Sequence, residues 1–83
     1  MKYIRREKAI KLIGKKIRDI RKTQKITQAQ LAFEAGIPRN QVVNIELGKV
    51  NTSISSIIAI AEILDVHPKE LFDIDFSENK KSK

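Results

Sequence analysis

The sequence predicts an all-α domain of five short helices, on three observations. Apolar residues recur at steps of three and four, the periodicity of helices with one buried face. Glycine and proline stand where such helices would end and begin. The 83 residues include no cysteine, so stability has to come from aliphatic packing in one small core. We therefore expect a single helical domain.

The first helix is indicated by Ile13, Ile17 and Ile20, which stand four and three residues apart among charged side chains. It can begin earlier, because residues 2–12 contain no helix breaker. Gly14 argues against one unbroken helix, since glycine is a poor helix former. The start of this helix is therefore left open by the pattern.

The second and third helices are marked by their end signals. Thr27 followed by Gln30 is a capping-box signature, and Gly36 is a typical helix stop. Pro38 suits the first turn of a helix, because the N–H that proline lacks has no partner there. The third helix is therefore expected from about Pro38 to Leu47, just before a second glycine.

The fourth and fifth helices follow from a capping serine and a second proline. Ser53 can cap a helix with one apolar stripe, made of Ile54, Ile57, Ile58, Ala61 and Leu64. Pro68 starts a short fifth helix that contains Leu71 and Phe72. The polar residues 77–83 are expected to form a disordered tail.

The charge is concentrated at one end of the chain. The net charge is +7, and residues 1–25 hold eleven Lys and Arg against two acidic residues. Such a field favours nucleic acid, an anionic membrane surface or an acidic protein, without choosing between them. No apolar run approaches the roughly 20 residues that span a bilayer and no secretory signal is present, so a cytoplasmic protein without a membrane partner is expected.

The chain has little that could support catalysis or bind a metal. His67 is the one histidine, no cysteine can join it, and Gly14 and Lys15 lack the rest of a phosphate-binding loop. No pair of carboxylates flanks an evident cleft. We therefore expect no enzyme activity, no cofactor and no metal.

The third helix is predicted to have two different faces. At about 100° per residue, Val42, Ile45 and Glu46 fall on one side. The other side, with the first turn, carries Arg39, Asn40, Val43, Asn44 and Leu47. Asn can pair with adenine in a major groove, Arg with guanine, and an aliphatic group can meet the thymine methyl. The alternative is an ordinary solvated surface.

The segment 12–73 carries a set of residues in a characteristic register, namely Ile17, Arg21, Thr27, Gln28, Leu31, Ala32, Ala35, Gly36, Ile37, Val42, Ile45, Glu46, Gly48, Ile60, Ala61, Leu64 and Val66. Through these residues it resembles the Cro/C1-type (Xre-like) helix-turn-helix family of phage and bacterial repressors. The resemblance implies a compact five-helix, lambda-repressor-like DNA-binding domain, with the helix-turn-helix at helices 2 and 3. We place it at residues 12–76, after a basic extension at 1–11 that is either a DNA-reaching arm or a solubilising tail.

The resemblance also implies roles for single residues. It assigns base reading to Arg39, Asn40, Val43 and Asn44. It assigns contacts with the DNA backbone to Gln28 and Lys49, to which we add Gln41, Lys15 and Lys16. It implies a structural ion pair between Arg21 and Glu46, for which two solvated surface charges are the alternative.

The chain departs from the family pattern in two turns. The family commonly has glycine where Lys25 stands, so the first turn is expected to be made differently, because lysine tolerates a left-handed conformation poorly. It often has a serine or threonine cap where Pro38 stands. The amide groups that begin the third helix then lack a side-chain acceptor, and a phosphate could supply one.

Two functions fit this sequence. The first is a sequence-specific DNA-binding transcriptional regulator that binds double-stranded DNA as a homodimer through Ile63, Ile74 and Phe76. Ile63 lies off the predicted core stripe, whereas the other two could instead fold back on their own core. The second is a protein-interaction module, such as an antitoxin, that mainly binds a protein partner.

Overall fold

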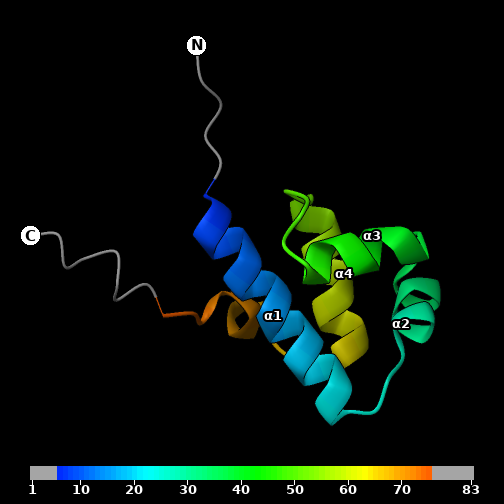
Figure 1. Cartoon of the computed structure of the whole chain (residues 1–83). Helices are drawn as coiled ribbons and strands as arrows, with labels where there is room; N and C mark the ends of the chain where they lie inside the picture. The colour runs from blue at the N-terminus through cyan, green and yellow to red at the C-terminus, as the bar shows by residue number, and fades with distance from the viewer. Residues whose placement is uncertain (1–5, 76–83) are drawn as a thin grey trace, which may run out of the picture.

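The computed structural model describes residues 6–75, and these form an all-helical domain (Figure 1). Its elements are α1 (Glu7–Thr23), α2 (Gln28–Ala35), α3 (Arg39–Glu46), α4 (Ile54–Leu64) and the 3₁₀-helix η1 (Pro68–Phe72). The predicted class is confirmed, with the fifth helix as a 3₁₀ turn. Within the described range no helix is long and apolar enough to cross a membrane. Phe76 and the tail at 77–83 lie outside that range.

Helix α1 starts at Glu7 and runs unbroken through Gly14, so part of the predicted extension is helical. Gly14 is a packing feature. A Cβ built on it would overlap the carbonyl oxygen of Ile45 and lie 3.0 Å from that of Glu46. The absent side chain thus lets α1 and the end of α3 approach backbone to backbone.

Capping side chains fix the starts of three elements. Thr27 Oγ1 accepts from the backbone N–H of Gln30 at 3.0 Å, although the Gln30 side chain does not complete the capping box and donates to Glu34 instead. Ser53 caps α4 through the N–H of Ser56. His67 Nδ1 accepts from the N–H of the second residue of η1 at 3.1 Å, so the histidine acts as a cap.

The core gathers aliphatic side chains from α1, α2, α3, α4 and η1, and the stripe predicted for α4 is partly wrong. Ile54 and Ile58 are 77% and 37% exposed, whereas Ile60 is fully buried. The buried face of α4 consists of Ile57, Ile60, Ala61 and Leu64. Isoleucines on almost every side of this helix make its rotation hard to predict, so packing decides which of them face inward.

The turn before α2 is made in the left-handed conformation that glycine would favour, which corrects our expectation for Lys25. Its φ is +62°. An L-residue in this region is strained by about 1–2 kcal/mol, since its Cβ crowds the following carbonyl.

Replacing Lys25 by glycine is therefore expected to raise the free energy of unfolding by about 0.5–1 kcal/mol, because relief of strain exceeds the entropy that glycine adds to the unfolded chain. Urea denaturation measures the change. The matched variant Lys22→Gly, at an exposed helical position of α1, should destabilise by about 1 kcal/mol. Equal effects at the two positions would contradict the strain at Lys25.

Candidate nucleic-acid interface

Helix α3 has one buried and one open face, as the helical wheel predicts. Val42, Ile45 and Glu46 are 0%, 3% and 6% exposed. The predicted base-reading set lies together on the open side, with Arg39 and Asn40 exposed and Val43 and Asn44 half-buried. Leu47, the C-cap residue, is 54% exposed beside them. Guanidinium, carboxamide and aliphatic groups are thus presented from one short helix.

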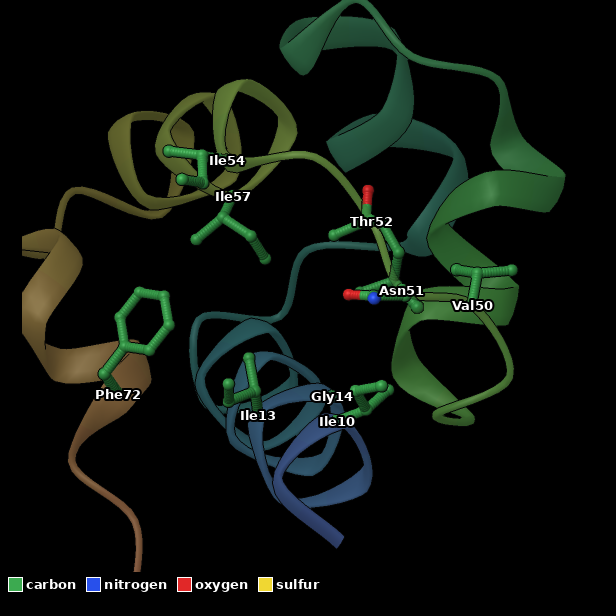
Figure 2. A pocket seen from close by; sticks show the side chains of 10 residues that line it. Ile10, Ile13, Gly14, Val50, Asn51, Thr52, Ile54, Ile57 and Phe72 are labelled. Atoms are coloured by element: carbon green, nitrogen blue, oxygen red, sulfur yellow. The ribbon is translucent and has the colours of Figure 1, made fainter. Parts of the chain in front are cut away.

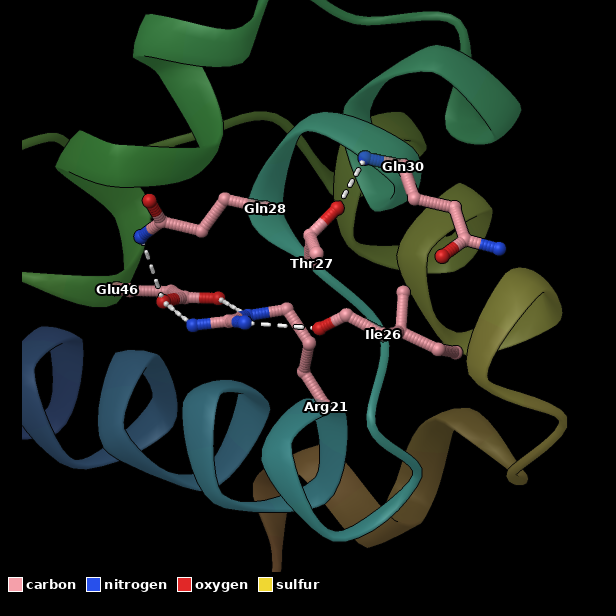
Figure 3. A network of polar contacts seen from close by, with 6 residues as sticks. All are labelled: Arg21, Ile26, Thr27, Gln28, Gln30 and Glu46. Atoms are coloured by element: carbon pink, nitrogen blue, oxygen red, sulfur yellow. Dashed lines mark hydrogen bonds and ion pairs between the residues drawn. The ribbon is translucent and has the colours of Figure 1, made fainter.

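A bidentate ion pair holds the inner side of α3 to α1 (Figure 3). Arg21 Nε donates to Glu46 Oε2 at 2.6 Å, and Arg21 Nη2 donates to Glu46 Oε1 at 2.9 Å. The two side chains are 11% and 2% exposed. In this geometry each charge is desolvated and depends on the other. The pair therefore fixes where α3 lies relative to α1.

Two further hydrogen bonds extend this network to the turn before α2. Arg21 Nη1 donates to the carbonyl oxygen of Ile26 at 2.8 Å, and Gln28 Nε2 donates to Glu46 Oε1 at 3.0 Å. Among the described residues, no buried side-chain nitrogen or oxygen lacks a hydrogen-bond partner. One carboxylate thus ties together α1, the start of α2 and the end of α3 (Figure 3).

Two of the residues assigned to the DNA backbone already have protein partners. Gln28 binds Glu46, which leaves one N–H of its carboxamide for another acceptor. Gln41 Nε2 donates to Thr52 Oγ1 at 3.3 Å, a link between α3 and the loop before α4 that no pattern in the sequence indicates. Lys49 is exposed in that loop. Phosphate contacts by these three residues stay predictions.

The structure does not bring Lys15 and Lys16 to the open face of α3. Gly14 and Arg21 are among the residues through which α1 meets α3, and the two lysines project more than a quarter turn away from them. They line a separate hollow that also includes Ile74. Lys15 Nζ donates to Asp19 Oδ2 at 2.7 Å, and this hydrogen bond lowers the pKa of Asp19.

The residues predicted for a dimer contact do not form one exposed patch in the described structure. Ile63 is half-buried and packs against the core, so its placement off the core was wrong. Ile74 is half-buried in a hollow whose charged groups come from α1 and from Asp73 and Asp75, which follow η1. Phe76 lies outside the described residues.

Comparison with known proteins matches this architecture. A helix-turn-helix family model matches residues 17–71. Control protein C.BamHI of Bacillus amyloliquefaciens is 40% identical over 63 residues, which cover 75% of this chain and 78% of that protein. The restriction-modification controller protein C.AhdI from Aeromonas hydrophila has a similar structure, with TM-score 0.75 and 35% identity over 76% of this chain and 96% of its own.

The biofilm master regulator SinR is similar in two structures. In complex with DNA it matches with TM-score 0.69 and 31% identity, covering 74% of this chain and 98% of its own. The SinR protein/SinI protein complex matches with TM-score 0.70 and 28% identity, over 82% of this chain and 72% of that chain. The residues matched by the family model include the whole of α2 and α3 and both partners of the ion pair, Arg21 and Glu46.

Proposed function

The chain belongs to the helix-turn-helix family, and we propose that it is a sequence-specific DNA-binding regulator of transcription, a phage-type repressor, controller or antitoxin-like protein. The observation that carries this is the open face of α3, where Arg39, Asn40, Val43 and Asn44 stand together on a helix that the core and the ion pair hold in place. A rigid helix with such groups can enter a major groove and read base edges. The regulators C.AhdI, C.BamHI and SinR support the same function.

Backbone contacts would flank the base contacts. The first amide groups of α3 have no side-chain cap, because Pro38 is the N-cap residue, so a phosphate oxygen can accept from them. Gln28 at the start of α2, which donates to Glu46 of α3, and Lys49 in the loop before α4 are the further candidates for phosphate contacts. The high positive charge of the first 25 residues adds attraction to the duplex and makes binding depend on salt.

A homodimer and a cytoplasmic location belong to the same proposal. One module of this size reads a few base pairs, whereas a two-fold dimer reads two half-sites about one helical turn, roughly 34 Å, apart. Regulators of this kind reach DNA in the cytoplasm. The operator is accordingly expected to be palindromic, and selection of bound sequences from a random DNA pool would identify it.

Replacing Asn40 and Asn44 together by alanine is expected to abolish discrimination between the selected operator and a scrambled duplex of equal length. Each carboxamide that pairs bidentately with a base contributes about 1–3 kcal/mol of discrimination. Loss of both should therefore reduce the affinity ratio by at least about thirtyfold, as measured by fluorescence anisotropy at fixed salt. Binding to scrambled DNA should change little.

Lys49→Gln is the control for the double asparagine variant, because Lys49 is predicted to contact the DNA backbone and not the bases. It should weaken binding to operator and scrambled duplexes alike, and lower the slope of log affinity against log salt by about one. If the double asparagine variant kept its full affinity ratio, base reading by α3 would be disproved, whatever the lysine variant did.

A protein-interaction module is the second candidate, and the SinR/SinI complex favours it. Phe33 on α2 is 87% exposed, so an apolar side chain is available for a protein partner on the helix next to α3. The two candidates differ in what Asn40 and Asn44 do. Intact repression in a reporter assay with both asparagines replaced would favour the protein-binding role.

A further inference from the structure

Helix α1 carries a row of three basic side chains along one side, beside its contact with α3. Lys11, Arg18 and Lys22 stand seven and four residues apart and are all exposed. At about 100° per residue they lie roughly 40–80° around the helix from Gly14, where the backbone of α3 touches α1. We call these three residues the basic row.

No carboxylate neutralises the basic row. Within residues 6–75, none of its three members forms an ion pair. The neighbouring Lys15, in contrast, donates to Asp19 at 2.7 Å, so its charge is already shared within the helix. Arg18 and Lys22 also repel each other as like charges one turn apart, by about 0.2–0.5 kcal/mol. The row is therefore suited to an anionic partner from outside the chain.

The basic row and the open face of α3 lie on the outer side of the contact between the two helices. On the other side of Gly14, Ile10 and Ile13 line the apolar hollow that α1 shares with α4 and η1 (Figure 2). Helix α3 turns Val42 and Ile45 into the same core. Because both helices direct their apolar sides inward, their polar sides are left facing outward together.

Lys11 brings one end of the basic row to the loop after α3. A Cβ built on Gly48 would overlap the side chain of Lys11 and lie 2.8 Å from its Cα. The missing side chain of Gly48 thus lets α1 pass directly against this loop. Lys49, a candidate for a phosphate contact, is the next residue of the loop.

The other end of the row lies near the start of α2. Arg18 and Lys22 flank Arg21, whose carboxylate partner Glu46 also accepts from Gln28 (Figure 3). Gln28 is the second candidate for a phosphate contact. The row therefore runs along α1 between the two places where the DNA backbone is expected to pass α3.

We propose that the basic row binds successive phosphates of the DNA strand that passes the ends of α2 and α3, an inference that rests on the proposed function. Eleven residues at about 1.5 Å each separate Lys11 from Lys22 by about 16 Å along α1. One strand carries a phosphate for roughly every 3.4 Å of duplex axis, so a few phosphates can face the row. An acidic protein would be attracted by the same charges, but a duplex held by α3 lies beside them.

Salt-dependent binding tests the row. Lys11→Gln and Arg18→Gln are each expected to weaken binding to operator and scrambled duplexes alike, by roughly three- to tenfold at about 0.1 M salt, and to lower the slope of log affinity against log salt by about one. Arg18→Lys keeps the charge and should keep the wild-type slope. Glutamine is a good helix former, and thermal unfolding checks that each variant is folded.

Lys69→Gln is the matched control, because it removes one exposed positive charge from η1, outside the row. Its affinity should stay within about twofold of wild type, with an unchanged salt slope. If Lys69→Gln lowered the slope as much as Lys11→Gln, net charge alone would explain the effect and the row would be refuted.

Duplexes in which one phosphate at a time is replaced by an uncharged methylphosphonate show whether the contact is direct. Replacing the phosphate that Lys11 contacts should weaken binding of wild type and have no further effect on Lys11→Gln. The same dependence is expected between Arg18 and another phosphate of that strand. The inference would be overturned if no single phosphate showed such a dependence on either residue.

The affinity ratio between operator and scrambled duplexes separates the row from base reading. Variants of the row should keep this ratio, whereas replacement of Asn40 and Asn44 should abolish it. A wild-type protein without preference for its operator would refute base reading, and the effect of the row would still be measurable on scrambled DNA. Wild-type salt slopes in Lys11→Gln and Arg18→Gln, together with an intact preference for the operator, would refute the row alone.

Discussion

Replacing Glu46 by alanine is expected to lower the free energy of unfolding by about 3–5 kcal/mol, the largest effect of any single side chain considered. The change leaves the guanidinium of Arg21 buried without its carboxylate, and an unpaired buried charge is strongly destabilising. Gln28 also loses its acceptor. For a domain of this size 1 kcal/mol corresponds to about 4–8 °C, so thermal unfolding should show a drop of roughly 15 °C or more.

Two controls distinguish the loss of the buried ion pair from the loss of any one charged side chain. Asp19→Ala removes the exposed pair with Lys15, in which both side chains are at least half exposed, and should change stability by less than about 1 kcal/mol. The double variant Arg21→Met with Glu46→Leu should be more stable than either single variant, because no lone charge is left in the interior. An equal, small effect of Glu46→Ala and Asp19→Ala would show that the pair is solvated.

The sequence predicts those features of the site that depend on residues close together in one helix, such as which side chains face the core. The wheel placed Val42 and Ile45 inward and Asn40 outward, because eight residues of one helix keep a fixed 3.6-residue repeat whatever surrounds them. The capping roles of Thr27 and Ser53 are equally local. The pairing of Arg21 with Glu46 came from family resemblance, since 25 residues separate the partners.

The failed expectations concern how helices turn toward one another. Helix α4 has isoleucines on several sides, so packing against α2, η1 and α1, rather than the pattern, decides that Ile57 and Ile60 are buried and Ile54 is not. The side of α1 on which Lys15 and Lys16 lie relative to α3 also depends on packing, and their contacts with the DNA backbone stay predictions. The left-handed Lys25 shows tertiary packing overriding local preference.

Gly14→Ala is expected to lower the free energy of unfolding by about 2 kcal/mol, although alanine is a better helix former by about 1 kcal/mol. The added methyl group would overlap the carbonyl oxygen of Ile45, and its near neighbours are backbone atoms of α3 that cannot rotate away. The middle of α1 and the end of α3 then have to separate. Urea denaturation monitored by circular dichroism gives the size and the sign of the change, and a stabilised variant would contradict the close approach.

A displacement of α3 would distinguish the effect of Gly14→Ala from the backbone strain that alanine causes at a glycine with positive φ. Gly36 has a φ of +74°, but a Cβ built on it meets no atom within 4 Å, so Gly36→Ala should cost about 1 kcal/mol through its backbone alone and leave α3 in place. Gly14→Ala should in addition reduce the operator-to-scrambled affinity ratio, because Arg39, Asn40 and Asn44 move with α3 relative to Gln28 and the DNA backbone. A variant that loses stability but keeps the full ratio would show that base reading tolerates this movement, and that the glycine serves packing alone.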